Sequence, residues 1–355
     1  MSRLKAISAL GQQVWLDSIS RKLIESGELA RLIAEDGISG VTSNPAIFQQ
    51  ALAKDPAYAA AKAALPATLT DAEARFEALA LPDIQAACDA FLPLFDASHG
   101  NKGYVSFEVS PRLSRDAEGT FAAAQRLWNA IARPNVMIKI PATPEGLVAI
   151  RKSIAAGINI NVTLMFSPAH VEAVAQAHAS GLADRVAAGL PVGQIRSVAS
   201  VFISRVDSKI DPLVSDALKG KVAIASARAA YADWQAHWSA TGDRFAALAA
   251  AGAHPQWLLW ASTGTKNPAY SDVLYVEALI GPDTVNTVPE ATLNAFRDHG
   301  NVAATLTKDP AEARATLKAL AEAGVDINAV GEQLQNEGLV LFEQAFETLL
   351  GSVGA

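Results

Sequence analysis

The stretch VMIKIP, from Val136 to Pro141, is a short apolar run with β-branched residues, a pattern typical of a buried strand. A segment with helical spacing, Pro144 to Ala156, follows it, and then a second apolar run, INVTLMF, from Ile160 to Phe166. A strand, a helix and another strand in this order predict a βαβ unit with two parallel strands. This stretch therefore indicates a parallel sheet.

The same alternation continues along the chain. Other segments, such as Ala117 to Ala132 and Pro168 to Ala188, also have helical spacing, with Ala and Leu on one face. Eight apolar runs alternate with such segments: Val14 to Ile19, Gly40 to Pro45, Tyr104 to Val109, Val136 to Pro141, Ile160 to Phe166, Val198 to Ile203, Trp257 to Ser262 and Asp283 to Val288. Eight βα units predict a (β/α)8 barrel. An open doubly wound sheet is the alternative, although its GxGxxG turn is absent from the sequence.

We expect residues 1–355 to form a single barrel domain, because no linker-like change in composition divides the chain. The intervals 48–102 and 206–256 are longer than one helix requires, and we expect helical insertions in both. Residues 308–350 also have helical patterns and are expected to pack over the barrel as a tail.

Composition narrows the class of protein. The net charge of −7 argues against binding to a nucleic acid, although a few local cations suffice for one small phosphate. No stretch of about 18 or more apolar residues appears, so we expect no contact with a membrane. Cys88 is the only cysteine, which excludes an intramolecular disulfide and a cysteine metal cluster and fits a cytoplasmic location. The six histidines lack HExxH or other ligand spacing, so no metal site is expected.

Polar side chains occupy the ends of the expected strands, where a barrel keeps its active site. Because side chains at i and i+2 of a strand share a face, Lys139 points away from its two isoleucine neighbours, which suit the helix layer. Lys139 is therefore expected inside the barrel, and the same parity turns Glu108, Asn161 and Thr163 inward. The candidate residues at the strand ends are Asp17, Asn44, Glu108, Lys139, Asn161, Thr163, Ser200 and Ser262.

Two interpretations of Lys139 compete. Burial favours the uncharged form of a lysine amine, which can then attack a carbonyl as the free base. The alternative is a structural ion pair with Glu108 or Asp17. Asp17 alone is also typical of a helix N-cap, and Thr163 alone of an ordinary strand residue. A buried ion pair stabilises a fold only weakly, and this one lies at the catalytic end of a barrel, which favours the catalytic role.

A group of potential phosphate ligands follows the sixth and seventh expected strands. Arg205 comes after the sixth, and Ser262, Gly264 and Lys266 come after the seventh, in ASTGTKNP. Barrels frequently bind phosphate in their last loops through backbone N–H groups and cations. We therefore expect a phosphate site here; the alternative is an arginine and a lysine solvated in ordinary turns.

Five strings of sequence together resemble the transaldolase family: GVTSNPAIF, VSFEVSPRLS, NVMIKIPAT, GININVTLMFS and WASTGTKNPAY. The resemblance runs from about Val14 to Arg297 in the order of the strands, and it is strongest to the branch found in actinobacteria and cyanobacteria. It implies that Lys139 is the Schiff-base lysine and that Asp17 is the principal acid and base.

The resemblance assigns the remaining candidates as well. It implies that Glu108 and Thr163 hold a catalytic water. Better-known members have an arginine near the position of Lys266, and an ammonium lacks the bidentate fork of a guanidinium. The implied contacts to substrate hydroxyls fall on Asn44 and Ser200, and those to phosphate fall on Arg205, Ser262 and Lys266.

The reaction implied by the resemblance needs no cofactor, because the lysine imine serves as the electron sink. A dihydroxyacetone unit passes from a ketose phosphate to an aldose phosphate in the non-oxidative pentose phosphate pathway. Sedoheptulose 7-phosphate and glyceraldehyde 3-phosphate then give erythrose 4-phosphate and fructose 6-phosphate.

Two alternatives to a transaldolase remain. The first is a fructose 6-phosphate aldolase that releases free dihydroxyacetone. Phe202 disfavours it, because this side chain offers no hydroxyl to a water. The second is a non-catalytic sugar-phosphate-binding barrel, which would not need Lys139, Asp17 and Glu108, and all three are present.

Overall fold

The structure is a computed structural model and describes residues 2–354. Its parallel strands follow one another in chain order around a closed barrel, in which β1 also pairs with β8. The predicted (β/α)8 barrel is thus confirmed. The strands are β1 (Gln12–Leu16), β2 (Gly40–Val41), β3 (Tyr104–Glu108), β4 (Val136–Pro141), β5 (Ile160–Met165), β6 (Ser197–Phe202), β7 (Trp257–Ala261) and β8 (Thr284–Val288).

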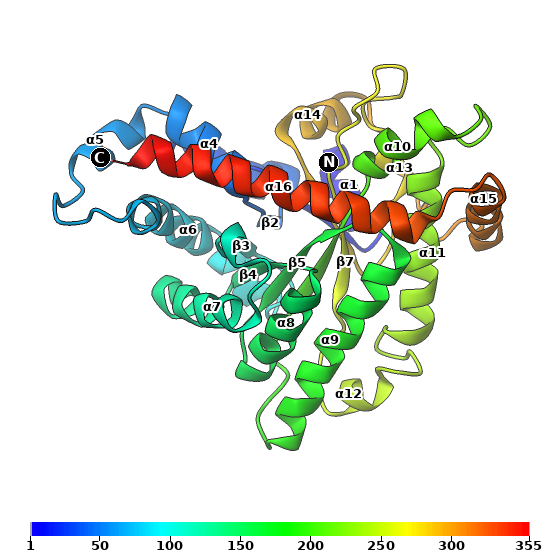
Figure 1. Cartoon of the computed structure of the whole chain (residues 1–355), viewed down its shortest axis with the longest axis horizontal. Helices are drawn as coiled ribbons and strands as arrows, with labels where there is room; N and C mark the ends of the chain where they lie inside the picture. The colour runs from blue at the N-terminus through cyan, green and yellow to red at the C-terminus, as the bar shows by residue number, and fades with distance from the viewer. Residues whose placement is uncertain (1, 355) are drawn as a thin grey trace.

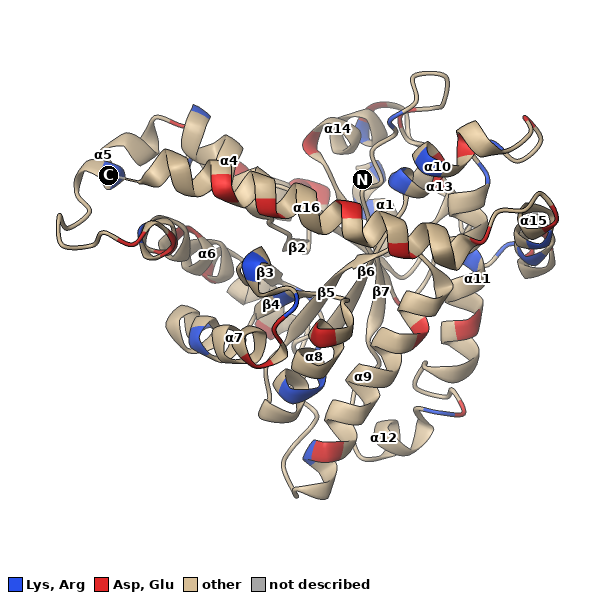
Figure 2. Ribbon diagram, in the orientation of Figure 1, with Lys and Arg blue, Asp and Glu red and all other residues tan. Residues whose placement is uncertain are grey.

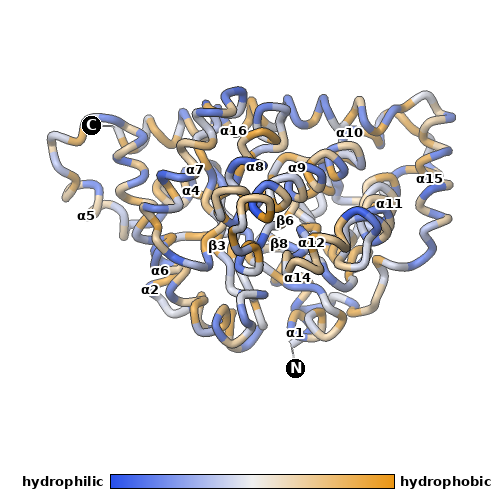
Figure 3. Tube along the Cα trace, turned by 90° about the horizontal axis from the view of Figure 1, so that it is seen from below, coloured by the Kyte–Doolittle hydropathy of each residue, from blue (hydrophilic) through white to orange (hydrophobic). Residues whose placement is uncertain are grey.

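Helices surround the strands on the outside of the barrel (Figure 1), and from below they form a ring around the sheet (Figure 3). The three connections between β3 and β6 contain one α-helix each: α7 (Ala117–Ile131), α8 (Pro144–Ala156) and α9 (Pro168–Ala187). The intervals in which insertions were expected hold α4 (Pro45–Lys54), α5 (Ala57–Ala63), α6 (Ala72–Ala97), α10 (Ser204–Ile210), α11 (Val222–His237) and α12 (Ala246–Ala250). The remaining α-helices are α1 (Arg3–Ser8), α2 (Arg21–Glu25), α3 (Glu28–Arg31), α13 (Leu274–Ala278), α14 (Glu290–His299), α15 (Pro310–Glu322) and α16 (Ile327–Val353). The single-domain organisation stays a prediction.

The largest difference from the expected strands is at β2, which contains only Gly40 and Val41. The side chain of Asn44 accepts a hydrogen bond from the backbone N–H of Ile47 at 3.0 Å and so caps α4, with proline at the first helical position. The expected strand therefore becomes a turn and a helix start. Gly40 is required where it stands, because a Cβ there would lie 2.5 Å from the indole of Trp15.

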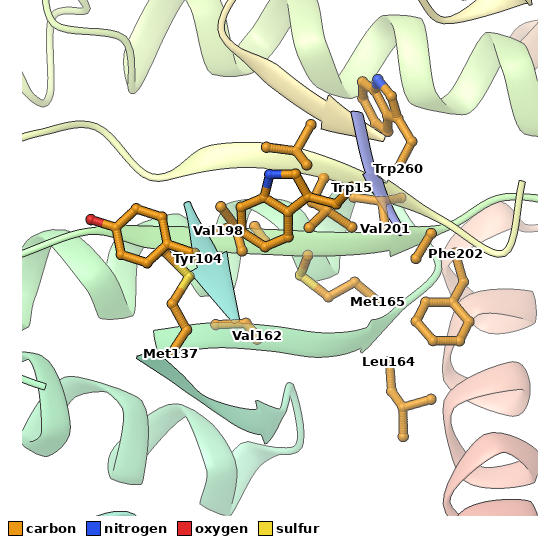
Figure 4. Close-up of a cluster of buried hydrophobic side chains, with 14 of the residues drawn as sticks. Trp15, Tyr104, Met137, Val162, Leu164, Met165, Val198, Val201, Phe202 and Trp260 are labelled. Carbon is orange, nitrogen blue, oxygen red and sulfur yellow. The ribbon is translucent and has the colours of Figure 1, made fainter. Parts of the chain in front are cut away.

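Apolar side chains fill the amino-terminal part of the barrel interior. Trp15, Tyr104 and Met137 gather there (Figure 4), and the rings of Trp15 and Tyr104 lie 6.4 Å apart between centroids. Trp260 faces the helix layer, because its strand neighbour Ala261 lines the pocket inside the barrel. This packing fills the amino-terminal part of the barrel, and the candidate residues lie toward the other end.

The last helix, α16, crosses the carboxyl ends of the strands (Figure 1). The side-chain amide of Gln335 donates hydrogen bonds to the carbonyls of Ala142 and Leu164, both at 3.0 Å, and thereby fixes the helix to β4 and β5. Gly338 permits the close approach, since a Cβ there would lie 2.9 Å from the Leu164 side chain. Charged residues lie mostly on the helices and loops (Figure 2), and the charged residues within the strands are Glu108 and Lys139.

The helix α6 is long and apolar enough to cross a membrane by length and composition alone. Core helices satisfy the same test. Phe76 and Phe91 of α6 are buried, and its Asp83 pairs with Arg21 at 2.9 Å and accepts a hydrogen bond from Tyr58 at 2.7 Å. These contacts are those of a helix packed against its own protein, so its composition is weak evidence for a membrane span.

Candidate active site

A pocket of about 310 Å³ opens at the carboxyl ends of the strands. Most of the candidate residues from the sequence line this one pocket: Asp17, Asn44, Lys139, Thr163, Ser200, Arg205, Ser262 and Lys266. Two candidates do not line it. Glu108 contacts Lys139 from behind, and Asn161 lies beneath the pocket floor.

Among the other lining residues, the polar or aromatic ones that were not singled out as candidates in the sequence are Thr42, Gln50, Thr287 and Phe342. Thr42 lies within GVTSNPAIF, one of the strings that resemble the family, and strand parity in β8 turns Thr287 inward. The sequence therefore contained an indication that both residues could face the pocket. Gln50 and Phe342 carried none, because both lie on helices, α4 and α16, whose docking depends on tertiary contacts.

A larger cavity of about 490 Å³ lies at the opposite end of the barrel, among segments that precede the strands. It is lined by Phe95, Trp128, Asn159 and Arg196, among others. Arg196 brings a positive charge to this cavity, but among the described residues neither a lysine nor a pair of carboxylates lines it. In a (β/α)8 barrel the amino-terminal face serves stability, whereas the carboxyl face serves chemistry. The smaller pocket is therefore the candidate active site.

Lys139 stands in the centre of this pocket. Its ammonium nitrogen Nζ lies 3.1 Å from Glu108 Oε2 and donates a hydrogen bond to the Ser43 carbonyl at 3.1 Å. Glu108 and Lys139 are register partners on β3 and β4, and the side chain of each is only 6% exposed. The ring of Phe342 lies 5.6 Å from Nζ. The lysine thus points inward, with a carboxylate on one side and an aromatic ring on another.

Glu108 is the partner of Lys139 and has an unusual environment. Burial raises the pKa of this carboxyl, and the negative charge of Asp17 acts in the same direction. The charge and hydrogen bond of Lys139 oppose that shift of the Glu108 pKa. A carboxyl with a raised pKa accepts a proton more readily than an exposed glutamate, and its contact with the amine places it to exchange that proton.

Asp17 follows β1 and projects into the pocket. Thr42 Oγ1 donates a hydrogen bond to Asp17 Oδ1 at 2.6 Å, and Thr287 Oγ1 lies 2.6 Å from Thr42 Oγ1 in turn. Burial raises the pKa of Asp17, while the Thr42 hydrogen bond and the positive charges of Lys139 and Lys266 lower it. Asp17 is not the helix cap that its position also allowed, because Ser20 caps α2.

Thr163 lies near the end of β5, where the pairing with β6 becomes irregular between Val162 and Met165. The next residue, Leu164, has a φ of 59°, which is uncommon for a leucine and marks a local kink. The hydroxyl of Thr163 is buried and has no hydrogen-bond partner among the described residues. A buried hydroxyl without a partner is costly, so a group in the pocket, such as a water or a substrate hydroxyl, would complete it.

Asn161 supports the pocket from below. Ser200 Oγ donates a hydrogen bond to Asn161 Oδ1 at 2.7 Å, and the Asn161 amide donates to Ser106 Oγ at 2.9 Å. Asn161 is fully buried and both ends of its amide are occupied. Its position therefore orients Ser200, which does line the pocket.

The cationic side of the pocket is built from segments that follow β6 and β7. Arg205, on α10, is half-buried, and its guanidinium carbon lies 5.4 Å from the Phe202 ring centroid. Burial lowers the pKa of Arg205, and no carboxylate pairs with this guanidinium in residues 2–354. Lys266 is exposed on the loop after β7. Ser262 has a φ of 54° and lies 3.0 Å from Ser204 between hydroxyl oxygens. An unpaired, partly desolvated guanidinium beside a loop of N–H groups and a lysine is suited to an anion.

The fold and the pocket together define a (β/α)8-barrel enzyme with a buried lysine–carboxylate pair at the carboxyl ends of its strands. Comparison with known proteins narrows this class. A family model described as transaldolase/fructose-6-phosphate aldolase matches residues 14–353, and the chain belongs to this family.

Individual relatives agree over their full lengths. The chain is 52% identical over 350 residues to a transaldolase of Neisseria gonorrhoeae, covering 99% of each protein. It is 49% identical over 362 residues to a transaldolase of Thiobacillus denitrificans, covering 100% of each. A protein named transaldolase 1 from Streptomyces coelicolor is 46% identical, with 99% of this chain and 93% of the relative covered. The Neisseria and Thiobacillus relatives are thus more similar than the actinobacterial one. The chain is an enzyme of the transaldolase type.

Proposed function

We propose that the chain transfers dihydroxyacetone units between sugar phosphates through a Schiff base on Lys139. The observation that carries this proposal is the buried contact of Lys139 Nζ with Glu108 at 3.1 Å, in a pocket that Asp17 and Arg205 also line. A proton that moves from the lysine ammonium to the carboxylate leaves a free amine and a carboxylic acid. These are the two forms that imine formation needs.

The first half of the reaction forms the imine. The free amine of Lys139 adds to the donor ketone, and the carbinolamine loses water when a proton reaches its oxygen. Glu108 supplies that proton through a water that Thr163 also holds, and the unpartnered Thr163 hydroxyl supports this role. The result is a protonated imine, which is an electron sink.

The second half breaks and remakes a carbon–carbon bond. Asp17 takes the proton of the C4 hydroxyl, the electron pair of the C3–C4 bond moves into the imine, and an aldose phosphate leaves. Burial raises the pKa of Asp17, which makes it a stronger base than an exposed aspartate. The three-carbon enamine stays bound to Lys139 until an acceptor aldehyde phosphate arrives, and the steps then run in reverse.

The rest of the pocket positions the substrate. Arg205, Ser262 and Lys266 are our candidates for the phosphate ligands, since they surround the cationic side of the pocket. Asn44 and Ser200 line the same pocket, which supports contacts to substrate hydroxyls. Asn161 then acts through its hydrogen bond with Ser200.

A fructose 6-phosphate aldolase is the second candidate, and it differs in how readily water protonates the enamine. Phe202 and Phe342 both line the pocket, and neither side chain can hold a water. Phe342 lies 5.6 Å from the amine that would carry the enamine. This apolar wall favours transfer over release. We place the reaction in the non-oxidative pentose phosphate pathway and in the cytoplasm, and the single free cysteine, Cys88, fits that compartment.

Borohydride reduction in the presence of fructose 6-phosphate, followed by peptide mapping, tests the proposal. We expect one adduct, on the peptide that contains Lys139, because reduction fixes the imine as a stable secondary amine. An adduct on another lysine such as Lys266, or the absence of an adduct, would contradict it. Turnover of fructose 6-phosphate with and without erythrose 4-phosphate separates the two candidates. Strong turnover without the acceptor would favour the aldolase.

A further inference from the structure

The two segments that carry the cationic side of the pocket are joined at two separate points. At the near point, the backbone N–H of Ser204 donates to the Ser262 carbonyl at 3.1 Å, and the hydroxyls of the same residues lie 3.0 Å apart. At the far point, the Tyr270 hydroxyl donates to Asp211 Oδ2 at 2.7 Å. Arg205 lies on the first segment and Lys266 on the second, between these two points.

A second hydrogen bond and a packing contact reinforce the far point. Asp211 Oδ1 accepts a further hydrogen bond from the backbone N–H of Gly220 at 2.9 Å. Gly220 has a φ of 69°, and a Cβ there would lie 2.9 Å from the ring of Tyr270. The tyrosine ring therefore packs against the glycine backbone while its hydroxyl bonds to the carboxylate. The hydroxyl and the ring of Tyr270 are therefore both held by the segment from Asp211 to Gly220.

A second carboxylate holds α10 in place on its buried side. Asp207 is two residues beyond Arg205 and accepts hydrogen bonds from the backbone N–H of Ala223 at 2.8 Å and from the Tyr275 hydroxyl at 2.9 Å. It is 1% exposed. Asp207 anchors α10 on one face, and Arg205 lines the pocket with no hydrogen bond or ion pair to its guanidinium within residues 2–354.

We propose that Asp211 and Tyr270 are positioning residues that hold the loop bearing Lys266 at a fixed distance from Arg205, so that both cations can contact one phosphate. This rests on the proposed function, because it takes Arg205 and Lys266 as phosphate ligands. An exposed loop must otherwise lose conformational freedom each time a ligand binds, which weakens binding. The hydrogen bond and the glycine packing order the loop in advance, and the benefit applies only to ligands that carry the phosphate.

The test compares acceptors that differ only in the phosphate, D-glyceraldehyde and glyceraldehyde 3-phosphate, in the full-length protein. For Tyr270→Phe we expect KM for glyceraldehyde 3-phosphate to rise about fivefold to tenfold, on the scale of one ordinary hydrogen bond, because the variant acts on the phosphate only through the position of the loop. We expect kcat and the KM for D-glyceraldehyde to change less than twofold. The inhibition constant of inorganic phosphate should rise in parallel with the first KM.

Two further variants make the comparison specific. Tyr231→Phe is the matched control, because the Tyr231 hydroxyl donates to the Pro282 carbonyl at 3.1 Å, away from the pocket, and we expect it to change neither KM. Gly220→Ala displaces the Tyr270 ring without removing its hydroxyl, and we expect the same selective rise. An unchanged KM for glyceraldehyde 3-phosphate, or equal changes for both acceptors, would overturn the positioning role.

Failure of this inference is distinguishable from failure of the proposed function. If Arg205→Met raises KM for glyceraldehyde 3-phosphate and Tyr270→Phe does not, the phosphate site stands and the positioning role falls. If wild-type protein forms no borohydride adduct on Lys139, the proposed function falls regardless of the Tyr270 result.

Discussion

The two halves of the pocket are built in different ways. The lysine half, formed by Asp17, Glu108, Lys139 and Thr163, lies on β3, β4 and β5 or directly after β1. The phosphate half, formed by Arg205, Ser262 and Lys266, lies on segments that follow β6 and β7. In the lysine half, Lys139 and Glu108 are 6% exposed and in direct contact. In the phosphate half, Lys266 is exposed and Arg205 has no carboxylate partner in residues 2–354.

This difference matches the chemistry that we propose for each half. A covalent step needs atoms placed within a few tenths of an ångström, and strand side chains are held by the backbone ladder on both sides. Phosphate binding needs positive charge and N–H groups over a wider area, which loops can supply if they are held in place. Substitutions in the lysine half should therefore lower kcat, whereas substitutions in the phosphate half should raise KM.

The largest effect is expected for Lys139→Met, which removes the nucleophile and leaves the phosphate half intact. We expect kcat to fall about 10⁴-fold or more, since the covalent route is lost. Stabilisation by fructose 6-phosphate in a thermal melt should persist, because Arg205, the proposed phosphate ligand, is still present. Lys152→Met, at an exposed lysine paired with Glu118, is the control. Retention of more than about a tenth of the activity would show that the lysine half is not the reacting half.

A smaller loss is expected for Glu108→Gln, which removes the proton donor but keeps the shape. We expect kcat to fall about 10²–10³-fold with little change in KM, and Thr163→Val to cost about tenfold. If both residues hold one water, the double variant should be no worse than about Glu108→Gln alone. Steady-state kinetics of the three variants measure this. Losses that simply multiply would mean that the two side chains act separately.

Substitutions in the phosphate half should change KM and leave kcat nearly unchanged. For Arg205→Met we expect KM for fructose 6-phosphate to rise about 10–100-fold with kcat nearly unchanged, since a charge-assisted pair to a phosphate contributes about 1.5–3 kcal/mol. Lys266→Met should raise KM only a few-fold, and raised salt should diminish that effect, because the exposed ammonium is screened. A larger effect from Lys266 than from Arg205 would place the phosphate on the loop instead of on α10.

The smallest change is a displacement of the pH profile by Thr42→Val. The hydrogen bond from Thr42 lowers the pKa of Asp17, so its loss raises the pKa of Asp17 further. Because Asp17 must be ionised to act as a base, the acid limb of kcat/KM should move to higher pH. One hydrogen bond to a charged group, about 1.5–3 kcal/mol, is the upper limit of the effect.

Two matched variants sharpen this test. Thr42→Ser retains the hydroxyl and should leave the pH profile unchanged. Thr287→Val removes the hydroxyl that contacts Thr42 and not the one that contacts Asp17, so it should move the profile less than Thr42→Val does. A displacement toward lower pH would exclude Asp17 as the group that produces the acid limb.

Much of the lysine half could be predicted from the sequence. Strand parity turned Lys139 and Glu108 inward, and β4 has the bounds that its apolar run indicated. At β5, strand parity predicted the direction of the side chains but not which of them line the pocket. Both Asn161 and Thr163 face the interior, but Asn161 is buried under Ser200, whereas Thr163 lines the pocket beside a kink at Leu164. Parity gives the face of a strand and not the depth at which a side chain lies.

The phosphate half and the covering helix were less accessible to sequence reasoning. The cations Arg205 and Lys266 were found because they follow strand ends, yet the contact of Tyr270 with Asp211 joins residues 59 positions apart. Phe342 is more than 200 positions from Lys139 and carries no local signal. It reaches the pocket because Gln335 and Gly338 fix α16 to the ends of β4 and β5.

The sequence by itself determined the barrel, the inward direction of Lys139 and the family, because alternation along a strand and along the chain is a local property. The tertiary structure decided which carboxylate meets the amine, how Thr42 and Thr287 bond to Asp17, and which helix closes the mouth of the pocket. Burial also raises the pKa of Glu108 and of Asp17, and burial exists only once distant segments pack together. Local periodicity thus sets where each functional group points, and long-range packing sets its partners and its ionisation.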